Sequence, residues 1–253
     1  MRFGLIGYPI AHSLSPQLFR AAYPDVPYRD TYELIETANF DEAVSIFKRD
    51  FDAINVTAPF KEKAFAIADR ADRNTERIGA SNLLIKKDGL ITAYNTDYEA
   101  VVHMLTALFS QRPFNNVLVA GCGGAGKAAA LAACDSGRNV TVANRDFAKA
   151  QHYCNALGGM KAAHLEDMPT LIAENELLIY TIPTLINELR NNLSEKVHNL
   201  SGKTVIEANY RNPSLSGGNY ISGKHWLAVQ AVISYKLMTG IAPMDTPLIN
   251  LLL

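Results

Sequence analysis

The sequence predicts an α/β fold divided into two domains, and three observations support this prediction. The chain has 253 residues, whereas a single domain usually has about 100–200. Apolar patterns typical of strands alternate with patterns typical of helices along most of the chain. A buried-type strand pattern at 116–121 leads into a glycine-rich loop at the start of an Ala-rich helix, an order that is typical of open parallel sheets.

The composition excludes several classes of protein. Hydrophobic residues make up 48% and charged residues 19% of the chain, which is ordinary for a globular protein and excludes disordered, collagen-like and coiled-coil chains. The 24 Lys and Arg residues nearly balance the 25 Asp and Glu residues, so we expect the protein to bind neither nucleic acid nor a membrane. Three widely spaced cysteines without a CxxC pair indicate neither a disulfide framework nor a metal site, and are typical of the cytoplasm. No signal peptide or membrane helix is expected, because no apolar run is long enough.

The first half of the chain predicts an α/β layer that ends near residue 97. A short apolar strand opens into a loop rich in Gly, Pro and Ser, and later helices are recognised by the spacing of their apolar residues. Asp88-Gly89 between two apolar runs is typical of a hairpin turn. The expected strands are 2–6, 30–35, 52–57, 82–85 and 90–94, and the expected helices are 14–22, 39–50 and 60–71.

The second half predicts a parallel sheet with connecting helices. Its strands are continuous apolar runs, as in sheets that are buried on both faces. Its helices end at glycines or prolines, such as Gly137, Gly240 and Pro243. The expected strands are 116–121, 139–143, 176–182 and 203–208, and the expected helices are 98–109, 126–136, 147–157 and 226–239.

The glycine loop predicts a dinucleotide site. Gly121, Gly123 and Gly126 have the GxGxxG spacing between a strand and a helix. Glycine is needed there for the tight turn, for close approach to a pyrophosphate and for helix packing on the strand, and the helix start presents N–H groups to the anion. This predicts a Rossmann dinucleotide-binding domain. The alternative is a glycine-rich turn that binds no ligand.

The end of the next strand indicates which dinucleotide. Asn144-Arg145 follows strand 139–143, and a guanidinium at this place favours the 2′-phosphate of NADP over the ribose of NAD. Asp146 leaves this open, because its carboxylate could repel the phosphate or pair with Arg145. Alternatively, Asp146 is simply the N-cap of helix 147–157. Lys149, one turn further on, adds a positive charge.

Four polar clusters in the first half follow or end strand patterns, where ligands bind in open α/β sheets. They are HSLSP (12–16), NVTAPFK (55–61), GASN (79–82) and NTD (95–97). Ser13 and Ser15 alternate, so both hydroxyls could face one carboxylate, although Ser15-Pro16 could equally cap a helix. Taken alone, Lys61 could be a solvated lysine and Asp97 an ordinary N-cap.

Together these clusters resemble the shikimate dehydrogenase family along nearly the whole chain. The matching motifs occur in the family's order: GLIGYPIAHSLSP (4–16), NVTAPFK (55–61), IGASN (78–82), NTD (95–97), GCGGAGKA (121–128), NR (144–145), Tyr210 with Pro213, and 223–230. The resemblance implies reversible reduction of 3-dehydroshikimate to shikimate with NADPH, in the synthesis of chorismate and aromatic amino acids, without a metal. It also implies a catalytic, substrate-binding domain of residues 1–99 with 226–253, and an inserted NADP-binding Rossmann domain of residues 100–225. It leaves the oligomeric state open between a monomer and a homodimer.

The resemblance also implies roles for individual residues. Lys61 and Asp97 would form the catalytic pair at the reacting oxygen, where a positioned cation can stabilise and protonate an alkoxide. The residues expected at the substrate are Ser13, Ser15, Asn55, Thr57, Asn82, Tyr210 and Gln230. The residues expected at NADP are Gly121, Cys122, Gly123, Gly124, Ala125, Gly126, Asn144, Arg145, Lys149, Thr181, Ala208 and Gly223.

The chain departs from the family pattern at several places. Phe19-Arg20 stand where the family usually has His-Asn, and 181–185 reads TIPTL where a Thr-Ser-x-Gly-Met type stretch is common. Glu207 replaces a common aspartate. Trp226 replaces a methionine and could stack on the cofactor or fill the core. Two alternatives therefore stay open: a quinate/shikimate dehydrogenase paralogue that uses NAD or NADP, and a sensor that binds shikimate-like acids without turnover.

Overall fold

The chain folds into two compact α/β units. The computed structural model describes residues 1–26, 31–189, 200, 202–215 and 218–244. One unit comprises Met1–Thr96 with Ala228–Leu253, and the other comprises Asp97–Leu227. Their boundaries fall at the start of helix α5 (Thr96–Gln111) and inside helix α10 (Gly223–Thr239), close to the expected domain boundaries. Each unit contains one six-stranded sheet, so the prediction of an α/β fold is confirmed.

The first unit has a mixed sheet in the order β2-β1-β3-β5-β6-β4. Its strands are β1 (Phe3–Gly7), β2 (Tyr32–Glu36), β3 (Ala53–Val56), β4 (Arg70–Ala71), β5 (Leu83–Lys87) and β6 (Leu90–Tyr94). The first three run parallel, whereas β5 runs antiparallel to both β3 and β6. The expected hairpin around Asp88-Gly89 is therefore confirmed, and both residues adopt positive φ there. Residue 30 of the expected strand 30–35 lies outside the described residues.

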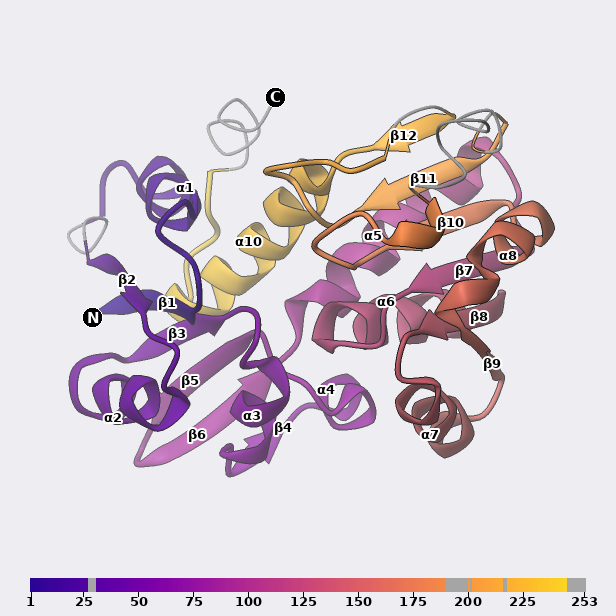
Figure 1. Ribbon diagram of the computed structural model, residues 1–253. Coiled ribbons are helices and arrows are strands. Elements are labelled where there is room, and N and C mark those ends of the chain that lie inside the picture. Colours follow the sequence, from indigo (N-terminus) through magenta and orange to yellow (C-terminus); the bar gives the residue numbers. More distant parts are fainter. Residues whose placement is uncertain (27–30, 190–199, 201, 216–217, 245–253) are drawn as a thin grey trace. The chain divides into compact units, whose positions relative to one another are not determined.

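Helices cover both faces of the first sheet (Figure 1). They are α1 (Ser15–Ala22), α2 (Phe40–Asp50), α3 (Lys61–Ala66), α4 (Arg73–Ile78) and the part of α10 from residue 228. On one face, Phe47 of α2 and Phe60, which directly precedes α3, are buried in one cluster with Ile54 of the sheet. On the other face Phe19 of α1 contacts both Tyr32 of β2 and Tyr235 of α10, with ring centroids 5.0 Å apart in each pair. The C-terminal helix is thus part of this unit's core.

One expected helix of the first unit is wrong in its extent. Helix 60–71 was expected as a single element, but α3 ends at Ala66, and residues 70–71 pair with β6 as a short strand. A separate helix, α4, follows because Asp72 caps it, its Oδ1 accepting hydrogen bonds from the N–H groups of Asn74 and Thr75. The segment 60–71 therefore contains a helix, α3, and a short strand, β4, and not one continuous helix.

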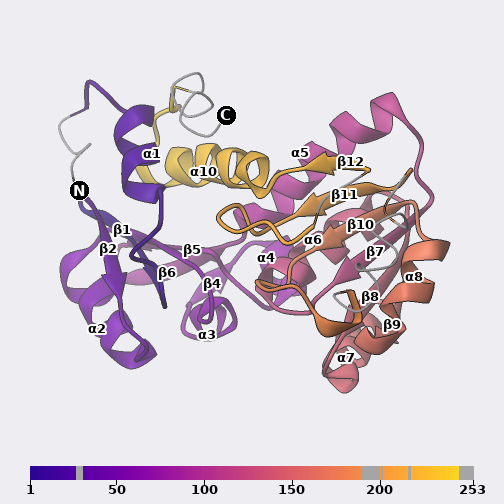
Figure 2. The ribbon, with the colours of Figure 1, turned by 45° about the horizontal axis from the view of Figure 1, so that its top comes forward.

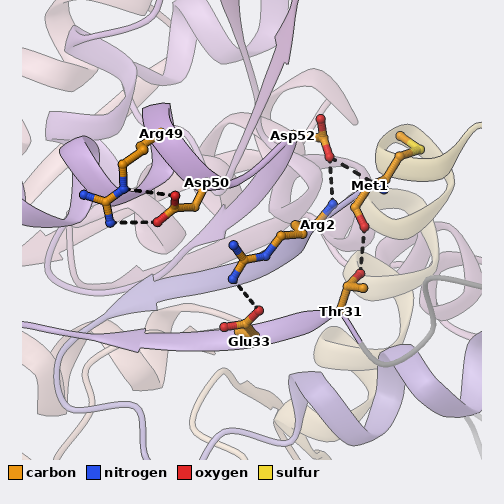
Figure 3. Close-up of polar contacts among 7 residues, drawn as sticks. All are labelled: Met1, Arg2, Thr31, Glu33, Arg49, Asp50 and Asp52. Atoms are coloured by element: carbon orange, nitrogen blue, oxygen red, sulfur yellow. Dashed lines mark hydrogen bonds and ion pairs between the residues drawn. The ribbon is translucent and has the colours of Figure 1, made fainter.

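The starts of the three parallel strands are joined by polar contacts (Figure 3). The Arg2 guanidinium pairs with Glu33 of β2 at 2.8 Å, while its N–H donates to the Asp52 carboxylate at 2.7 Å. The hydrogen bond and charge of Glu33 raise the pKa of Arg2. Exposed pairs of this kind contribute little stability. They lie at the starts of the strands, whereas the candidate site lies at the opposite ends.

The second unit has a fully parallel sheet, whose strands lie side by side in the order β12-β11-β10-β7-β8-β9 (Figure 2). The strands are β7 (Asn116–Ala120), β8 (Asn139–Asn144), β9 (Met160–His164), β10 (Leu177–Tyr180), β11 (Thr204–Glu207) and β12 (Asn219–Ile221). If β7 is numbered as the first strand of the unit and the sheet is followed from the β9 edge to the β12 edge, the order is 3-2-1-4-5-6. This is the strand order of a Rossmann fold. The sequence missed β9 and β12, which are the two edge strands and lack a continuous apolar run.

Helices of the second unit pack against its sheet. They are α5 from residue 97, α6 (Gly124–Asp135), α7 (Phe147–Leu157), the short 3-10 helix η1 (Leu165–Asp167), α8 (Met168–Glu174) and the start of α10. The Ala-rich run of α6 is completely buried, since small side chains let the helix approach β7 and β8. The sequence missed α8, which buries Met168 and Ile172 against Leu118 and Leu178.

Glu176 makes the stability of the second unit depend on pH. Its carboxylate accepts hydrogen bonds from the N–H groups of Asn115 and Asn116 at 2.9 and 2.8 Å. The bond from Asn116 is the main cause that lowers the pKa of Glu176 below the ordinary 4.5. A lowered pKa in the folded state stabilises the fold above the ordinary pKa, and this contribution is lost as the pH falls through the lowered value.

We therefore expect Glu176→Gln to lower Tm at pH 7 by about 2–4 °C. The variant should also lose less stability than the wild type on acidification. Thermal unfolding between pH 7 and pH 3 measures both effects, with the exposed Glu174→Gln as control. Parallel Tm curves of Glu176→Gln and the wild type over the whole range would contradict this role of Glu176.

Candidate active site

The ends of β1 and β3 bring two of the expected clusters together in the first unit. A Cβ on Gly7 would collide with Cγ2 of Thr57 and would lie 2.7 Å from Cγ2 of Ile10, so glycine is what allows the two loops to touch. Beyond this contact, the Ser13 hydroxyl donates to the Ser15 hydroxyl at 3.1 Å, and both serines are buried. The alternative role of Ser15 as helix cap is wrong, since α1 begins at Ser15 and makes no side-chain cap bond.

Asn55, the last polar residue of β3, is held by three partners. Its Oδ1 accepts from the Tyr32 hydroxyl at 2.8 Å, and its Nδ2 donates to the Ser234 hydroxyl at 2.6 Å and to the Asn82 carbonyl at 3.1 Å. Burial raises the pKa of Tyr32, whose hydroxyl also interacts with Ser15. The network therefore connects the serine cluster, the end of β3 and α10.

Asn82 and Gln230 meet at Thr96. The Asn82 side chain donates to Oγ1 of Thr96 at 2.9 Å and accepts from its N–H at 2.8 Å. The Oε1 of Gln230 lies 3.4 Å from both Nδ2 of Asn82 and Oγ1 of Thr96. The structure thus brings together two expected substrate residues that are 148 positions apart in the sequence.

Lys61 lies beside the same loop. It is the first residue of α3 and is half-buried. Its carbonyl accepts from the N–H of Ser81 at 2.8 Å, and the Asn95 amide donates to the Ala80 carbonyl at 2.7 Å. The backbone at Lys61 is therefore tied to the residues next to Asn82.

The sequence missed several residues that support this network. Ser234 and Tyr235 of α10 are fully or almost fully buried, and the Tyr235 hydroxyl donates to the Ser15 carbonyl at 3.0 Å. A signal was present, because residues four apart on a helix share a face, and Ser234 follows Gln230 at that spacing. Tyr32 and Thr96 had no comparable signal in the sequence.

The glycine loop of the second unit is closely packed on its inner side. A Cβ on Gly126 would collide with the Gly121 carbonyl oxygen, and a Cβ on Gly121, which has φ +101°, would lie 2.6 Å from Oγ1 of Thr181. Gly123 differs, since a Cβ there would meet nothing within 4 Å. Gly123 is the N-cap of α6, which makes no side-chain cap bond. The helix start is thus open on the side where a pyrophosphate would bind.

The ends of the neighbouring strands complete this edge of the sheet. Thr181 follows β10 and donates through Oγ1 to the Ala120 carbonyl at 2.8 Å, and the N–H of Ala208 donates to the Tyr180 carbonyl at 2.9 Å. A Cβ on Gly223 would lie 2.5 Å from the carbonyl oxygen of Ala208. Glycine is therefore required where α10 begins against the end of β11.

Arg145 lines a cavity of about 650 Å³ beside the glycine loop. The cavity lies at the ends of β8, β9 and β10, and His164 and Glu166 also line it. The Asn144 side chain accepts from the N–H of Cys122 at 3.1 Å and so connects the cavity to the loop. The Asp146 carboxylate accepts from the N–H of Lys149 at 3.0 Å, which confirms its role as the N-cap of α7.

Asp97 and Tyr210 belong to the second unit. Asp97 is 5% exposed in the first turn of α5, inside the helix and not at its N-cap, and its Oδ1 accepts from Nε1 of Trp226 at 2.9 Å. Tyr210 lies half-buried in the loop 208–215. This loop is held by the fully buried Glu207, whose carboxylate accepts from the N–H of Ser214 at 2.6 Å. Glu207 therefore organises the backbone around Tyr210.

The three cysteines are thiols that form no disulfide. Cys122 in the glycine loop is buried. Burial raises the pKa of Cys154 to about 11, so its reactive thiolate is scarce at neutral pH.

The described residues contain no group of three or more His, Cys, Asp or Glu side chains placed to hold a metal ion. They also contain no helix long and apolar enough to cross a membrane.

The Rossmann order of the second sheet and the open glycine loop define the class of protein, a dinucleotide-binding α/β protein with a second α/β unit. Family models agree with this division. The model described as the shikimate dehydrogenase substrate binding domain matches residues 5–84, and the model of shikimate / quinate 5-dehydrogenase matches residues 104–205.

Individual relatives extend over nearly the whole chain. The shikimate dehydrogenase (NADP(+)) of Halobacterium salinarum is 32% identical over 94% of this chain and 93% of its own length. The crystal structure of shikimate 5-dehydrogenase from Thermus thermophilus, in complex with NADP(H) and shikimate, matches with a TM-score of 0.81 and 26% identity. The match covers 100% of this chain and 98% of that structure. The chain belongs to the shikimate dehydrogenase family.

Proposed function

We propose that the protein catalyses the reversible, NADP-dependent reduction of 3-dehydroshikimate to shikimate. The observation that carries this proposal is the network of Asn82, Thr96 and Gln230, which joins two expected substrate residues that are 148 positions apart, Asn82 and Gln230, through Thr96. This network lies in the unit that contains the match to a substrate binding domain. The H. salinarum relative, named for NADP, and the T. thermophilus complex support the choice of cofactor and substrate.

The first unit supplies groups suited to a hydroxylated carboxylic acid. The paired hydroxyls of Ser13 and Ser15 bind the carboxylate in this proposal, and Tyr210 is a further substrate residue. Thr57, Asn82 and Gln230 hydrogen-bond the ring hydroxyls. Asn55 belongs to the same set, since its Oδ1 can accept a second hydrogen bond besides that from Tyr32.

The second unit has residues that fit NADP. The open space over Gly123 and the start of α6 accept a pyrophosphate, and Gly121 and Gly126 allow the loop to close beneath it. Arg145 binds the 2′-phosphate at the cavity, since the Asp146 carboxylate is engaged at the start of α7. The other expected contacts at this edge are Cys122, Gly124, Ala125, Asn144, Lys149, Thr181, Ala208 and Gly223.

Lys61 and Asp97 act on the reacting oxygen. When bound, NADPH supplies the hydride that reduces the carbonyl carbon. Negative charge develops on the carbonyl oxygen as the hydride arrives, and the Lys61 ammonium stabilises this charge and donates the proton. Asp97, in the first turn of α5, orients the reacting groups. In the oxidation of shikimate, Lys61 accepts the proton instead.

The same proposal covers location and assembly. Thiols without disulfides at all three cysteines suit a reducing cytoplasm. A small-molecule substrate requires no macromolecular partner, and both a monomer and a homodimer are compatible with it. A sensor would need neither a proton donor nor a group to orient it, so the presence of both Lys61 and Asp97 favours an enzyme.

Initial rates test this function. Purified protein is assayed for cofactor reduction with shikimate and quinate, each with NADP and NAD. We expect a strong preference for shikimate with NADP. Comparable rates with NAD or quinate would instead identify the broader paralogue. Binding of shikimate without turnover under any condition would identify a sensor and overturn the proposal.

A further inference from the structure

We propose that Trp226 is a positioning residue for the Asp97 carboxylate. The proposal rests on the proposed function, in which Asp97 acts beside the reacting oxygen. The indole N–H of Trp226 donates to Oδ1 of Asp97 at 2.9 Å, across 129 positions of sequence. The sequence left this tryptophan open between stacking on the cofactor and filling the core.

Burial makes this bond strong and directional. Trp226 is 4% exposed and Asp97 is 5% exposed, so water competes poorly for either group. A buried indole N–H needs an acceptor, and a charged acceptor gives a stronger hydrogen bond than a neutral one. The bond fixes one carboxylate oxygen and thereby restricts rotation of the carboxylate.

The backbone holds Trp226 in place. One turn earlier, Gly223 packs so closely that a Cβ would lie 2.5 Å from the Ala208 carbonyl oxygen and 2.6 Å from that of Glu207. Glu207 in turn is buried and bonded to the N–H groups of Ser214 and Leu215. The start of α10 is therefore anchored on the end of β11, which makes the indole a rigid support for Asp97.

The helical turn that supports Asp97 also carries an expected cofactor contact. Gly223 is an expected NADP contact, and Trp226 follows it by one helical turn on α10. A ligand that contacts Gly223 acts on the same turn that orients Asp97. Trp226 is also the single tryptophan of the chain, so its fluorescence reports directly on this contact.

A double-mutant cycle tests the proposal. Trp226→Phe keeps an aromatic ring but removes the N–H donor. We expect it to lower kcat for shikimate oxidation about tenfold, the loss of one hydrogen bond to a charged group, with KM for NADP within about twofold. In an Asp97→Asn background, the same substitution should change kcat less than about twofold, because the carboxylate it orients is gone.

Controls separate this role from a purely structural one. Tyr98→Phe, at the neighbouring position of α5, removes a different hydrogen bond to a carboxylate, the one that the Tyr98 hydroxyl donates to Asp135, and should leave kcat unchanged. An unchanged kcat in Trp226→Phe, or an equal loss in both backgrounds, would overturn the proposal. The wild-type rate is measured first, so absence of wild-type turnover would count against the proposed function alone.

Fluorescence tests the contact without the Trp226 variant. Asp97→Asn replaces the charged acceptor with a neutral amide, so we expect the emission maximum or quantum yield of the single tryptophan to change. Tyr98→Phe should leave the spectrum unchanged. Identical spectra of the wild type and Asp97→Asn would overturn the proposal even if Trp226→Phe failed to fold.

Discussion

Replacing Lys61 with alanine is expected to lower kcat for shikimate oxidation by about 10²–10⁴-fold, the usual contribution of a positioned general acid or base. The ammonium is the group proposed to stabilise the developing alkoxide and to exchange its proton. The dissociation constant of NADP should change less than about twofold, because the expected NADP contacts all belong to the second unit. Steady-state rates and fluorescence titration with NADP measure the two effects.

Lys63→Ala is the matched control for Lys61→Ala. Lys63 lies on the same short helix, is exposed, and has its ammonium over the Phe40 ring at 5.8 Å. Its removal should leave kcat unchanged. If Lys61→Ala kept most of the activity, or lost NADP binding in the same proportion as turnover, the assigned chemical role of Lys61 would be wrong.

Gly126→Ala is expected to have the largest effect on the cofactor site. The added Cβ would overlap the Gly121 carbonyl oxygen, which is backbone and cannot rotate away. We expect a loss of about 1–3 kcal/mol in the free energy of unfolding, as for other substitutions that force the backbone to shift. NADP affinity should fall at least about tenfold, since the loop that holds the pyrophosphate is displaced. Denaturant unfolding and NADP titration measure these losses.

Gly123→Ala separates cofactor contact from folding. A Cβ at Gly123 meets nothing within 4 Å, and its φ of −85° suits any residue. The unfolding free energy should therefore change by less than about 1 kcal/mol. NADP affinity should still fall, because the new methyl group occupies the space proposed for the pyrophosphate. Unchanged NADP affinity in Gly123→Ala would mean that the ligand does not approach the loop at this point.

Long periodic segments could be predicted from the sequence, and short or edge elements could not. The runs at 116–121 and 139–143 became β7 and β8, because buried parallel strands are apolar on both faces. The edge strand β9 has a mixed pattern, since one of its sides lacks a neighbouring strand. Helix α3 ended early because pairing of residues 70–71 with β6 outweighed a continuing helical pattern.

The candidate site divides in a similar way. Ser13, Asn55, Lys61 and Asn82 lie in short motifs that the sequence displays directly. Their supports do not: Tyr32, Ser234 and Tyr235 have ordinary places in a strand and a helix, and only the fold brings them to the motifs. Trp226 was open between filling the core and stacking on the cofactor. It is buried, and its N–H bonds Asp97.

The sequence alone determined the α/β class and the glycine loop and predicted the candidate reactive side chains, because these depend on local periodicity and on the chemistry of single residues. Tertiary structure decided which side chains meet. The contacts of Gln230 with Asn82 and of Trp226 with Asp97 join segments more than a hundred residues apart. Such contacts depend on how strands and helices pack in space, and no local pattern in the chain records that packing.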